Sequence, residues 1–334
     1  MQKIFPVRRF RRFYHYRFER RQFVLAPSAA MYIRSFLRRL RHKNSQSDKW
    51  ISSPPFFNGI KGSPSITWIG HSTFLIQVGG KTILTDPIFG DATFLFKRAV
   101  SSPIMIDDLP HIDYILISHN HRDHMDEVSI RALKERFSDV KILVPYGDKK
   151  WFDARFISHV DEFFWWETFN GDDVSFTFLP AHHWSGRGFY DRNQSLWGSW
   201  MIEVGGLTIY FAGDTGYWKH FSCIRHYFPS IDVALMPIGP CEPLEYMRKS
   251  HLNADFAVRA FLELGARLLI PMHWGTFYFG TDQFLTPITY LREAWNKRAS
   301  LLEDKMLQIL KFGEVILLPN LFTENASVTS SLEL

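Results

Sequence analysis

Three histidines and an aspartate occupy six positions in the first half of this sequence. His119, His121, Asp123 and His124 follow the apolar run 114–117. A run of this kind predicts a buried strand, so the cluster begins where a strand ends. Because side chains two positions apart in an extended segment share a face, His119 and His121 can bind one ion together. Asp123 and His124, where the chain turns towards a helix, can hold a second ion.

The types of these side chains indicate which metals they would bind. Imidazole and carboxylate suit zinc, and also manganese or iron, better than calcium or magnesium. A polar surface loop that happens to be rich in histidine is the alternative, and the H-x-H-x-D-H spacing after an apolar strand argues against it. The segment therefore predicts half-sites for two metal ions.

Three later segments place a His or Asp just past an apolar run, in turns that contain small residues. The candidates are His182, His183, Asp214 and His273. Each has an alternative interpretation, because Asp before Thr-Gly is commonly a turn former and His before Trp is commonly a packed core group. Four such strand ends in one chain favour a shared metal centre.

Several longer motifs resemble the metallo-β-lactamase superfamily. Within it, they are most similar to the branch of N-acylphosphatidylethanolamine-hydrolysing phospholipase D and its bacterial relatives. In the family's order, between about residues 64 and 318, they are TWIGHST (67–73), LTDPIF (84–89), ISHNHRDH (117–124), LWGSW (196–200), FAGDTGY (211–217), PIG (237–239) and HWGTF (273–277). The letters SGRG (185–188) and DRN (191–193) look more like the bacterial members than the mammalian enzyme.

The resemblance implies an α/β fold, the four-layer αββα sandwich, with metals at one edge between its two sheets. It also implies two sets of ligands that share a bridging carboxylate. One ion would be held by His119, His121 and His183, and the other by Asp123, His124 and His273, with Asp214 bridging the two.

Other residues take implied roles around the ions. His251 matches a family histidine that faces the substrate phosphate. The mammalian enzyme has a substrate-contacting tyrosine where this chain has Arg122, so the substrate need not be the same. We expect Asp123 to orient the attacking hydroxide, while His251 or Arg122 stabilises negative charge or protonates the leaving oxygen. Asp214, as the bridge, would hold both ions during the reaction.

Three more polar residues lie close to these motifs. Asp86 follows the strand 83–85 and is expected to orient a ligand imidazole through its free N–H. His182 is expected at the rim of the site. His71, beside Gly70, is as readily a structural histidine as part of the site.

The expected activity is that of a zinc-dependent hydrolase with two Zn²⁺ per chain, Mn²⁺ or Fe²⁺ being alternatives. Two metals about 3.5–4 Å apart lower the pKa of a bridging water from ~15.7 toward ~7. We expect a phospholipase D-like phosphodiesterase acting on N-acylphosphatidylethanolamine or a related phospholipid. A lactonase or a sugar-phosphate hydrolase is the alternative within the superfamily. A non-enzymatic membrane- or nucleic-acid-binding protein is disfavoured, because structural zinc sites are typically mononuclear and Cys-rich.

The elements that position these residues are partly readable. Strands are predicted at 66–69, 73–78 and 81–85, with a hairpin at Gly79-Gly80, and helices at about 127–137, 254–264 and 287–303. Asn253 is the expected N-cap of the second helix, and Gly265 follows its end. A hydrophobic content of 46% supplies a core, and no linker divides the chain after residue 64. The aromatic clusters 94–96 and 163–166 could line an acyl-chain groove or pack against the sheets.

The first 43 residues differ in charge from the rest. They hold 13 Lys and Arg and one acid, a net charge of +12, so within a total of +5 the remainder carries −7. We divide the chain into a basic aromatic-rich arm (1–43), a connecting segment (44–63), the hydrolase domain (64–320) and a C-terminal tail (321–334). In the arm, an apolar stripe flanked by arginines predicts a basic amphipathic helix at a membrane surface. The stripe is Ile33, Phe36, Leu37 and Leu40.

Other interpretations of the arm remain open. Its cations interleave with aromatics at 8–14, as in nucleic-acid-binding segments, although nucleic acid is not the expected partner. The letters RRQFVL at 20–25 faintly resemble a twin-arginine signal, and the arm could also pack on its own acidic domain. The apolar stretch 23–33 is too short to span a bilayer. Cys223 and Cys241 lack CxxC spacing, which fits a reducing compartment. We expect a cytoplasmic, peripherally membrane-bound protein, with a homodimer left open.

Overall fold

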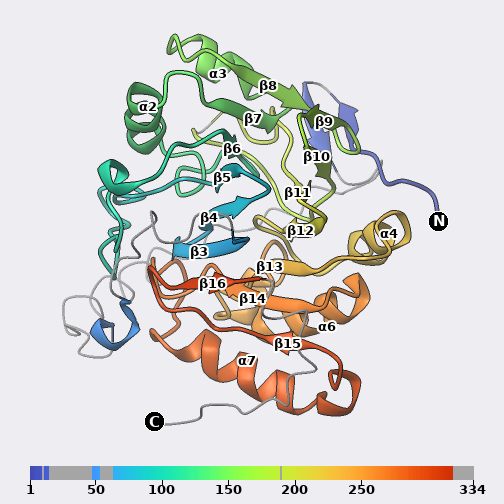
Figure 1. The fold of residues 1–334 in the computed structure, drawn as a ribbon. Helices are drawn as coiled ribbons and strands as arrows, with labels where there is room; N and C mark the ends of the chain where they lie inside the picture. Colours follow the sequence, from blue (N-terminus) through green and yellow to red (C-terminus); the bar gives the residue numbers. More distant parts are fainter. Residues whose placement is uncertain (10, 15–46, 53–62, 189, 319–334) are drawn as a thin grey trace.

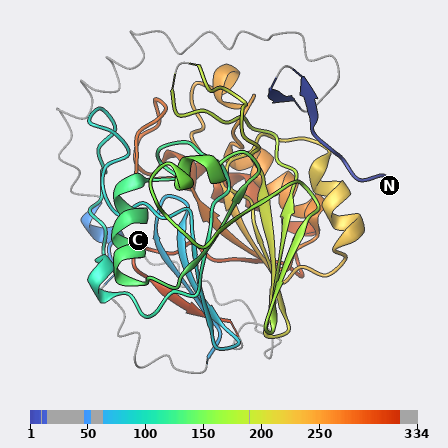
Figure 2. The ribbon, with the colours of Figure 1, turned by 90° about the horizontal axis from the view of Figure 1, so that it is seen from above.

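The computed structural model describes residues 1–9, 11–14, 47–52, 63–188 and 190–318. Two seven-stranded sheets pack face to face, and helices cover their outer sides (Figures 1 and 2). This is the four-layer αββα sandwich that the sequence predicted. Of the predicted C-terminal tail, 321–334, nothing lies within the described residues.

The first sheet has the strand order β16-β3-β4-β5-β6-β7-β8. Its strands are β3 (Ser65–Gly70), β4 (Thr73–Val78), β5 (Lys81–Thr85), β6 (Tyr114–Leu116), β7 (Lys141–Pro145), β8 (Val160–Phe163) and β16 (Val315–Leu317). β16 to β5 pair antiparallel, and β5 to β8 pair parallel. The three strands predicted here are confirmed. Gly79 and Gly80 have φ of +59° and +74°, which a tight hairpin with two left-handed residues requires.

The second sheet has the order β15-β14-β13-β12-β11-β10-β9. Its strands are β9 (Thr168–Gly171), β10 (Val174–Leu179), β11 (Ser199–Val204), β12 (Leu207–Phe211), β13 (Val233–Pro237), β14 (Leu268–Met272) and β15 (Met306–Leu307). β9 to β12 pair antiparallel, and β12 to β15 pair parallel. In both sheets the parallel strands deliver their following loops to a single edge.

Helices cover both outer faces. They are α2 (Glu127–Arg136), α3 (Lys149–Asp153), α4 (His220–Tyr227), α5 (Leu244–Met247), α6 (Ala254–Leu264) and α7 (Thr286–Asn296). The predicted caps of α6 are confirmed, since the Asn253 side chain accepts from the Phe256 N–H and Gly265 has φ +72°. The helix predicted at 287–303 ends earlier, at Asn296. A 3-10 turn, Ala299–Leu301, follows and brings Leu302 into the core before β15.

Two apolar clusters hold these layers together. The larger one joins both sheets and includes Trp68 and Phe74 from the first sheet and Trp200 from the second. The smaller one lies under α2 and includes Leu75 and Ile130. Neighbours Phe74 and Leu75 belong to different clusters because successive side chains of a strand point to opposite faces. The sheets are thus buried on both faces, which explains the continuous apolar runs in the sequence.

The beginning of the predicted arm lies against the hydrolase domain. It forms a short hairpin, β1 (Val7–Arg9) with β2 (Arg12–Tyr14), coloured dark blue in Figure 1. Trp166 Nε1 donates a hydrogen bond of 2.6 Å to the carbonyl of Ile4, and the Tyr227 hydroxyl donates one of 2.7 Å to that of Met1. The predicted amphipathic helix lies outside the described residues. Within the described part, no helix has the length and apolar content needed to cross a bilayer.

Candidate metal centre

The seven predicted metal ligands come together at one edge of the sandwich. Four lie in the turn between β6 and α2, and the others follow β10, β12 and β14. They are His119, His121, Asp123, His124, His183, Asp214 and His273. The loops meet because both sheets present their strand ends on this side.

One group consists of three histidines. His119 Nε2 lies 2.7 Å from His121 Nδ1, which lies 3.2 Å from His183 Nε2. The ligand atoms of the three residues all lie within 4.8 Å of one another. This is the set that the resemblance assigned to one ion.

A second group contains Asp123, His124 and His273 and also includes His71. His71 Nε2 lies 3.0 Å from Asp123 Oδ2 and 3.3 Å from His124 Nε2. The sequence left a structural role for His71 open, and the structure places its ring in the centre. The available signal was that His71 lies within the matched motif TWIGHST; in the structure it occupies the turn between β3 and β4 with φ +53°.

Asp214 lies between the two groups. Its Oδ1 is 3.1 Å from His273 Nε2, and its Oδ2 is 3.5 Å from His124 Nε2 and 3.8 Å from His183 Nε2. A single carboxylate therefore reaches ligands of both groups. This is the arrangement that a bridging ligand needs.

Asp86 orients imidazoles of both groups. Its carboxylate lies 2.7 Å from His124 Nδ1 and accepts a 2.6 Å hydrogen bond from the Ser118 hydroxyl. Because that hydroxyl donates to Asp86, it accepts from His119 Nδ1 at 2.9 Å. Both imidazoles therefore carry a hydrogen on Nδ1 and present Nε2 to the centre. The hydrogen bond predicted for Asp86 is present.

A third imidazole, that of His183, is oriented by the backbone. His183 Nδ1 lies 2.8 Å from the carbonyl of Ser250, so it donates there and directs its Nε2 inward. Like the two imidazoles bonded through Asp86, His183 is thus fixed in the tautomer that a metal ligand requires.

Protonation states of several ligands in the centre suit metal binding, although at His124 burial is outweighed by the carboxylates of Asp214 and Asp123, which hold its pKa well above the usual range. Burial and the neighbouring imidazoles of His124 and His121 hold the pKa of His119 well below its usual range. Burial likewise lowers the pKa of His121 to about 4. Although burial opposes ionisation of Asp214, the imidazoles of His273 and His124 hold its pKa well below the usual range. Neutral imidazole and ionised carboxylate are the forms that bind metals.

Buried polar atoms also indicate that the residues fit metal ions. Asp214 Oδ1, His273 Nε2 and His251 Nδ1 make no hydrogen bond among the described residues, although Asp214 Oδ1 and His273 Nε2 lie only 3.1 Å apart. An unsatisfied buried polar group typically costs about 1–3 kcal/mol, and an unpaired charge costs more. Divalent ions with nitrogen and oxygen ligands would satisfy these atoms, and zinc, manganese and iron accept such sets.

The predicted substrate-contacting residues lie beside this centre. His251 Nδ1 is 3.5 Å from Asp214 Oδ2, and burial lowers its pKa to about 4. His251 also forms a group of potential ligands with His183 and Asp214. Arg122 is exposed and donates to the carbonyl of Arg187 at 3.3 Å, at the rim of the site. The ring of His182 lies near Trp218, outside the ligand groups.

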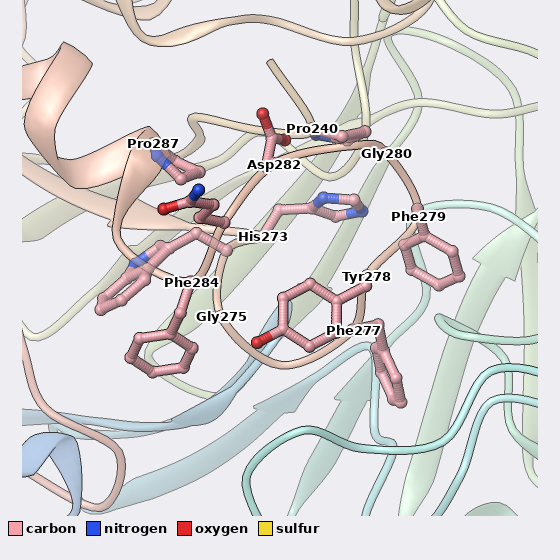
Figure 3. A pocket seen from close by; sticks show the side chains of 12 residues that line it. Pro240, His273, Gly275, Phe277, Tyr278, Phe279, Gly280, Asp282, Phe284 and Pro287 are labelled. Carbon is pink, nitrogen blue, oxygen red and sulfur yellow. The ribbon is translucent and has the colours of Figure 1, made fainter. Parts of the chain in front are cut away.

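An aromatic wall borders the second group. The rings of Phe277 and Phe279 lie 5.0 and 5.8 Å from His71, and Phe96 lies 5.0 Å from Phe279. In Figure 3 the imidazole of His273 points towards Phe279. Beyond Phe96, Phe94 is 83% exposed. We call residues 94–96, 277 and 279 the aromatic ridge, which runs from the centre to solvent.

The fold and site define a metallo-hydrolase, and comparisons with known proteins agree. The Beta-lactamase superfamily domain matches residues 81–274. The chain is 32% identical over 313 residues to N-acyl-phosphatidylethanolamine-hydrolyzing phospholipase D 1 of Caenorhabditis elegans, covering 86% of this chain and 88% of that protein. A metallo hydrolase structure from Ignicoccus hospitalis has the same fold, with a TM-score of 0.59 at 22% identity over 76% of this chain and 97% of that one.

A mitochondrial N-acyl-phosphatidylethanolamine-hydrolyzing phospholipase D of Saccharomyces cerevisiae is 37% identical over 232 residues. The match covers 66% of this chain and 49% of that protein, so the chain spans about half the length of the yeast relative. The protein therefore belongs to the metallo-β-lactamase superfamily, in the branch of N-acylphosphatidylethanolamine-hydrolysing phospholipase D. It is a hydrolase, and its family and donor set imply divalent metal.

The role of Asp86 can be tested by Asp86→Asn, which keeps the size of the side chain and removes its charge. We expect metal affinity to fall about 10–100-fold, because outer partners of ligand imidazoles contribute this much. Competition with a chelator would measure it. The exposed Asp107 provides the control Asp107→Asn. Equal affinity of Asp86→Asn and wild type would show that Asp86 does not orient the ligands.

Proposed function

We propose that the protein is a dinuclear-metal phosphodiesterase that acts in the manner of phospholipase D on N-acylphosphatidylethanolamine or a related phospholipid. The observation that supports this most is the carboxylate of Asp214, which lies between two histidine-rich groups beside an aromatic ridge. The activity for which the relatives from Caenorhabditis elegans and Saccharomyces cerevisiae are named supports the choice of substrate.

In this proposal each of the two groups of ligands would hold one metal ion. His119, His121 and His183 would hold one Zn²⁺, and Asp123, His124 and His273 would hold the other, with Asp214 binding both. Mn²⁺ or Fe²⁺ would suit the same donors. When bound, the two ions activate water as a nucleophile and draw charge from the phosphoryl oxygen.

Asp123 and His251 are placed to move protons. The side chain of Asp123 is 16% exposed and that of His251 is 18% exposed, whereas Asp214 is 2% exposed. The carboxylate of Asp123 is therefore accessible to solvent, so it can orient and deprotonate the attacking water. Water attacks phosphorus, and the bond from phosphorus to the head-group oxygen breaks. His251, whose Nδ1 lies 3.5 Å from Asp214 Oδ2, can hydrogen-bond to the phosphoryl group, and the negative charge of that group would favour the protonated imidazole that can pass a proton to the leaving oxygen.

The aromatic ridge favours a lipid over a lactone or a sugar phosphate. Two ring contacts lead from His71 through Phe279 to Phe96, and the residues just before Phe96 in the sequence, Phe94 and Leu95, are exposed. Hydrogen bonds from the Leu95 and Phe96 N–H groups to the Thr93 hydroxyl hold this tip in a fixed turn. Acyl chains would cover these apolar surfaces, which a small polar substrate would leave in water.

The substrate assignment can be tested with a panel of phospholipids, an acyl-homoserine lactone and a sugar phosphate. We expect the metal-loaded protein to release phosphatidic acid and the N-acylated head group from N-acylphosphatidylethanolamine, as identified by mass spectrometry. Turnover of the lactone or the sugar phosphate alone would contradict the proposal.

His251→Ala should reduce turnover while metal content stays at the wild-type value. Loss of acid–base assistance typically costs about 10²–10⁴-fold in rate. Elemental analysis and steady-state kinetics would measure both quantities, with the exposed His111→Ala as the control. If His251→Ala lost a metal ion, His251 would be a ligand rather than a substrate-facing group.

The ridge predicts a difference between two kinds of substrate. Replacing Phe94 and Leu95 by serine should slow hydrolysis of vesicle phospholipid by about tenfold or more, since burying such side chains contributes about 1.5–3 kcal/mol each. Hydrolysis of a soluble chromogenic phosphodiester should be unchanged. Phe156→Ser is the control. Phe156 is 97% exposed and precedes β8, so it lies at the end of the parallel strands away from the metal centre. Equal loss on both substrates would contradict a lipid-contacting ridge.

We also propose that the basic arm holds the protein peripherally on anionic membranes, on the basis of its charge of +12 against −7 for the remainder. Replacing Arg34, Arg38, Arg39 and Arg41 by glutamine should weaken co-sedimentation with anionic vesicles by about 1 kcal/mol per cation near the surface. Lysine at the same positions keeps the charge and serves as the control. Unchanged sedimentation of the glutamine variant would refute this proposal.

A further inference from the structure

The N-terminal hairpin is fixed to the hydrolase domain by a buried phenylalanine. Phe13 is 1% exposed, and its ring packs edge-on against Tyr146 and Phe164 with centres 6.1 Å away in both cases. Tyr146 and Phe164 stack on each other at 4.0 Å. The ring of Phe13 thus completes an aromatic cluster of the domain, although it comes from the start of the chain.

Asn193 joins this hairpin to the loop that follows the ligand His183. Its backbone carbonyl accepts from the Phe13 N–H at 2.7 Å, and its Nδ2 donates to the Phe13 carbonyl at 3.2 Å. Its own N–H donates to the Ser185 carbonyl at 2.8 Å, and its Oδ1 accepts from the Ser185 N–H at 3.2 Å. Asn193 has φ +57°, a conformation that asparagine tolerates better than most residues. Two of its polar contacts hold the hairpin and two hold Ser185.

The same loop forms hydrogen bonds with the turn that carries four of the proposed metal ligands. The Gly186 N–H donates to Asn120 Oδ1 at 2.7 Å, and Arg187 Nη1 donates to the Asn120 carbonyl at 3.0 Å. Asn120 is buried and stands between two ligand histidines of the three-histidine group. Its Nδ2 donates to Asp148 at 2.8 Å. The position of Asn120 is therefore set from the loop on one side and from Asp148 on the other.

A second contact runs in parallel. The ring of Trp184 lies 4.1 Å from that of His121, and the guanidinium of Arg192 lies 4.4 Å from the centre of the Trp184 ring. Arg192 is the neighbour of Asn193 in the DRN motif. The SGRG and DRN segments thus connect the hairpin to the ligands by packing as well as by hydrogen bonds.

We propose that the N-terminal hairpin is a positioning element of the metal centre, acting through Phe13 and Asn193 on the three-histidine group. Neither residue touches a ligand. The path runs from Phe13 to Asn193, then through the Ser185–Gly186 backbone to Asn120. Such a path keeps the distances among His119, His121 and His183 fixed without adding a donor atom to the site, and it holds whichever substrate the centre hydrolyses.

Two substitutions in the full chain interrupt the path at different points. Phe13→Ala removes the buried ring. Asn193→Asp keeps the size of the side chain and its acceptor for Ser185, and replaces the donor to the Phe13 carbonyl by an acceptor. We expect both variants to bind one of the two proposed ions about tenfold more weakly. This is the low end of the loss of metal affinity that follows when a residue supporting a metal ligand is replaced. Titration of metal-depleted protein with Zn²⁺ measures this, and the Co²⁺ absorption spectrum reports the altered ligand geometry.

Matched controls separate positioning from general stability. Phe5 lies in the same segment and is 59% exposed, so Phe5→Ala should bind metal as the wild type does. Phe137 is a buried phenylalanine of the cluster under α2, so Phe137→Ala should lower the melting temperature without changing metal affinity. Phe13→Leu, which refills much of the space, should recover most of the affinity.

The proposal is wrong if Asn193→Asp and Phe13→Ala both bind Zn²⁺ with wild-type affinity and show the wild-type Co²⁺ spectrum. It is also wrong if their affinities fall only by the factor seen in Phe137→Ala, because the hairpin would then stabilise the fold alone. If Phe13→Ala does not fold, the nearly isosteric Asn193→Asp decides the question by the same two readouts.

Discussion

The site depends on one buried carboxylate, that of Asp214. An ionised carboxylate almost removed from solvent is costly unless positive charge compensates it, and no Lys or Arg is paired with Asp214 among the described ion pairs. Its neighbours are imidazoles, of which burial keeps those of His183 and His251 neutral, while at His124 burial is outweighed by Asp214 and Asp123, which raise the pKa. Metal cations bound by those imidazoles would compensate the buried negative charge of Asp214. The carboxylate and the histidines therefore form a metal site only in combination. The sandwich brings the carboxylate and the histidines together, because its two sheets present their strand ends at one edge.

The two sides of this centre have different surroundings. On the side of Asp123 and His71, the aromatic ridge offers an apolar path to solvent. On the side of His121 and His183, the loop of residues 184–193 is bonded to Asn120 and to the N-terminal hairpin. One side can therefore receive an apolar substrate while the other keeps the ligands in place. The action on phospholipid proposed above would use both sides.

Local patterns predicted much of the fold and the site. An H-x-H-x-D-H segment after an apolar run, and turns after three further strands, located the candidate ligands, since a strand end is visible in the sequence; the resemblance to the family then selected His183 over its neighbour His182. The caps Asn253 and Gly265 were likewise local signals. The hydrogen bonds between Phe13 and Asn193 could not be predicted, because they join residues 180 positions apart in the sequence. The described start of the arm carries the buried side chain of Phe13, which agrees with the alternative that the arm packs on its own domain, while the apolar stripe predicted to meet a membrane lies outside the described residues.

The central claim is that two ions share Asp214, and metal analysis combined with substitution tests it most directly. Elemental analysis of fully loaded, active protein should find close to two transition-metal ions per chain. Asp214→Ala should lose activity and at least one ion, because that carboxylate is assigned to both. A fully active wild-type protein with a single ion, or an Asp214→Ala variant that keeps two ions and full activity, would contradict the account.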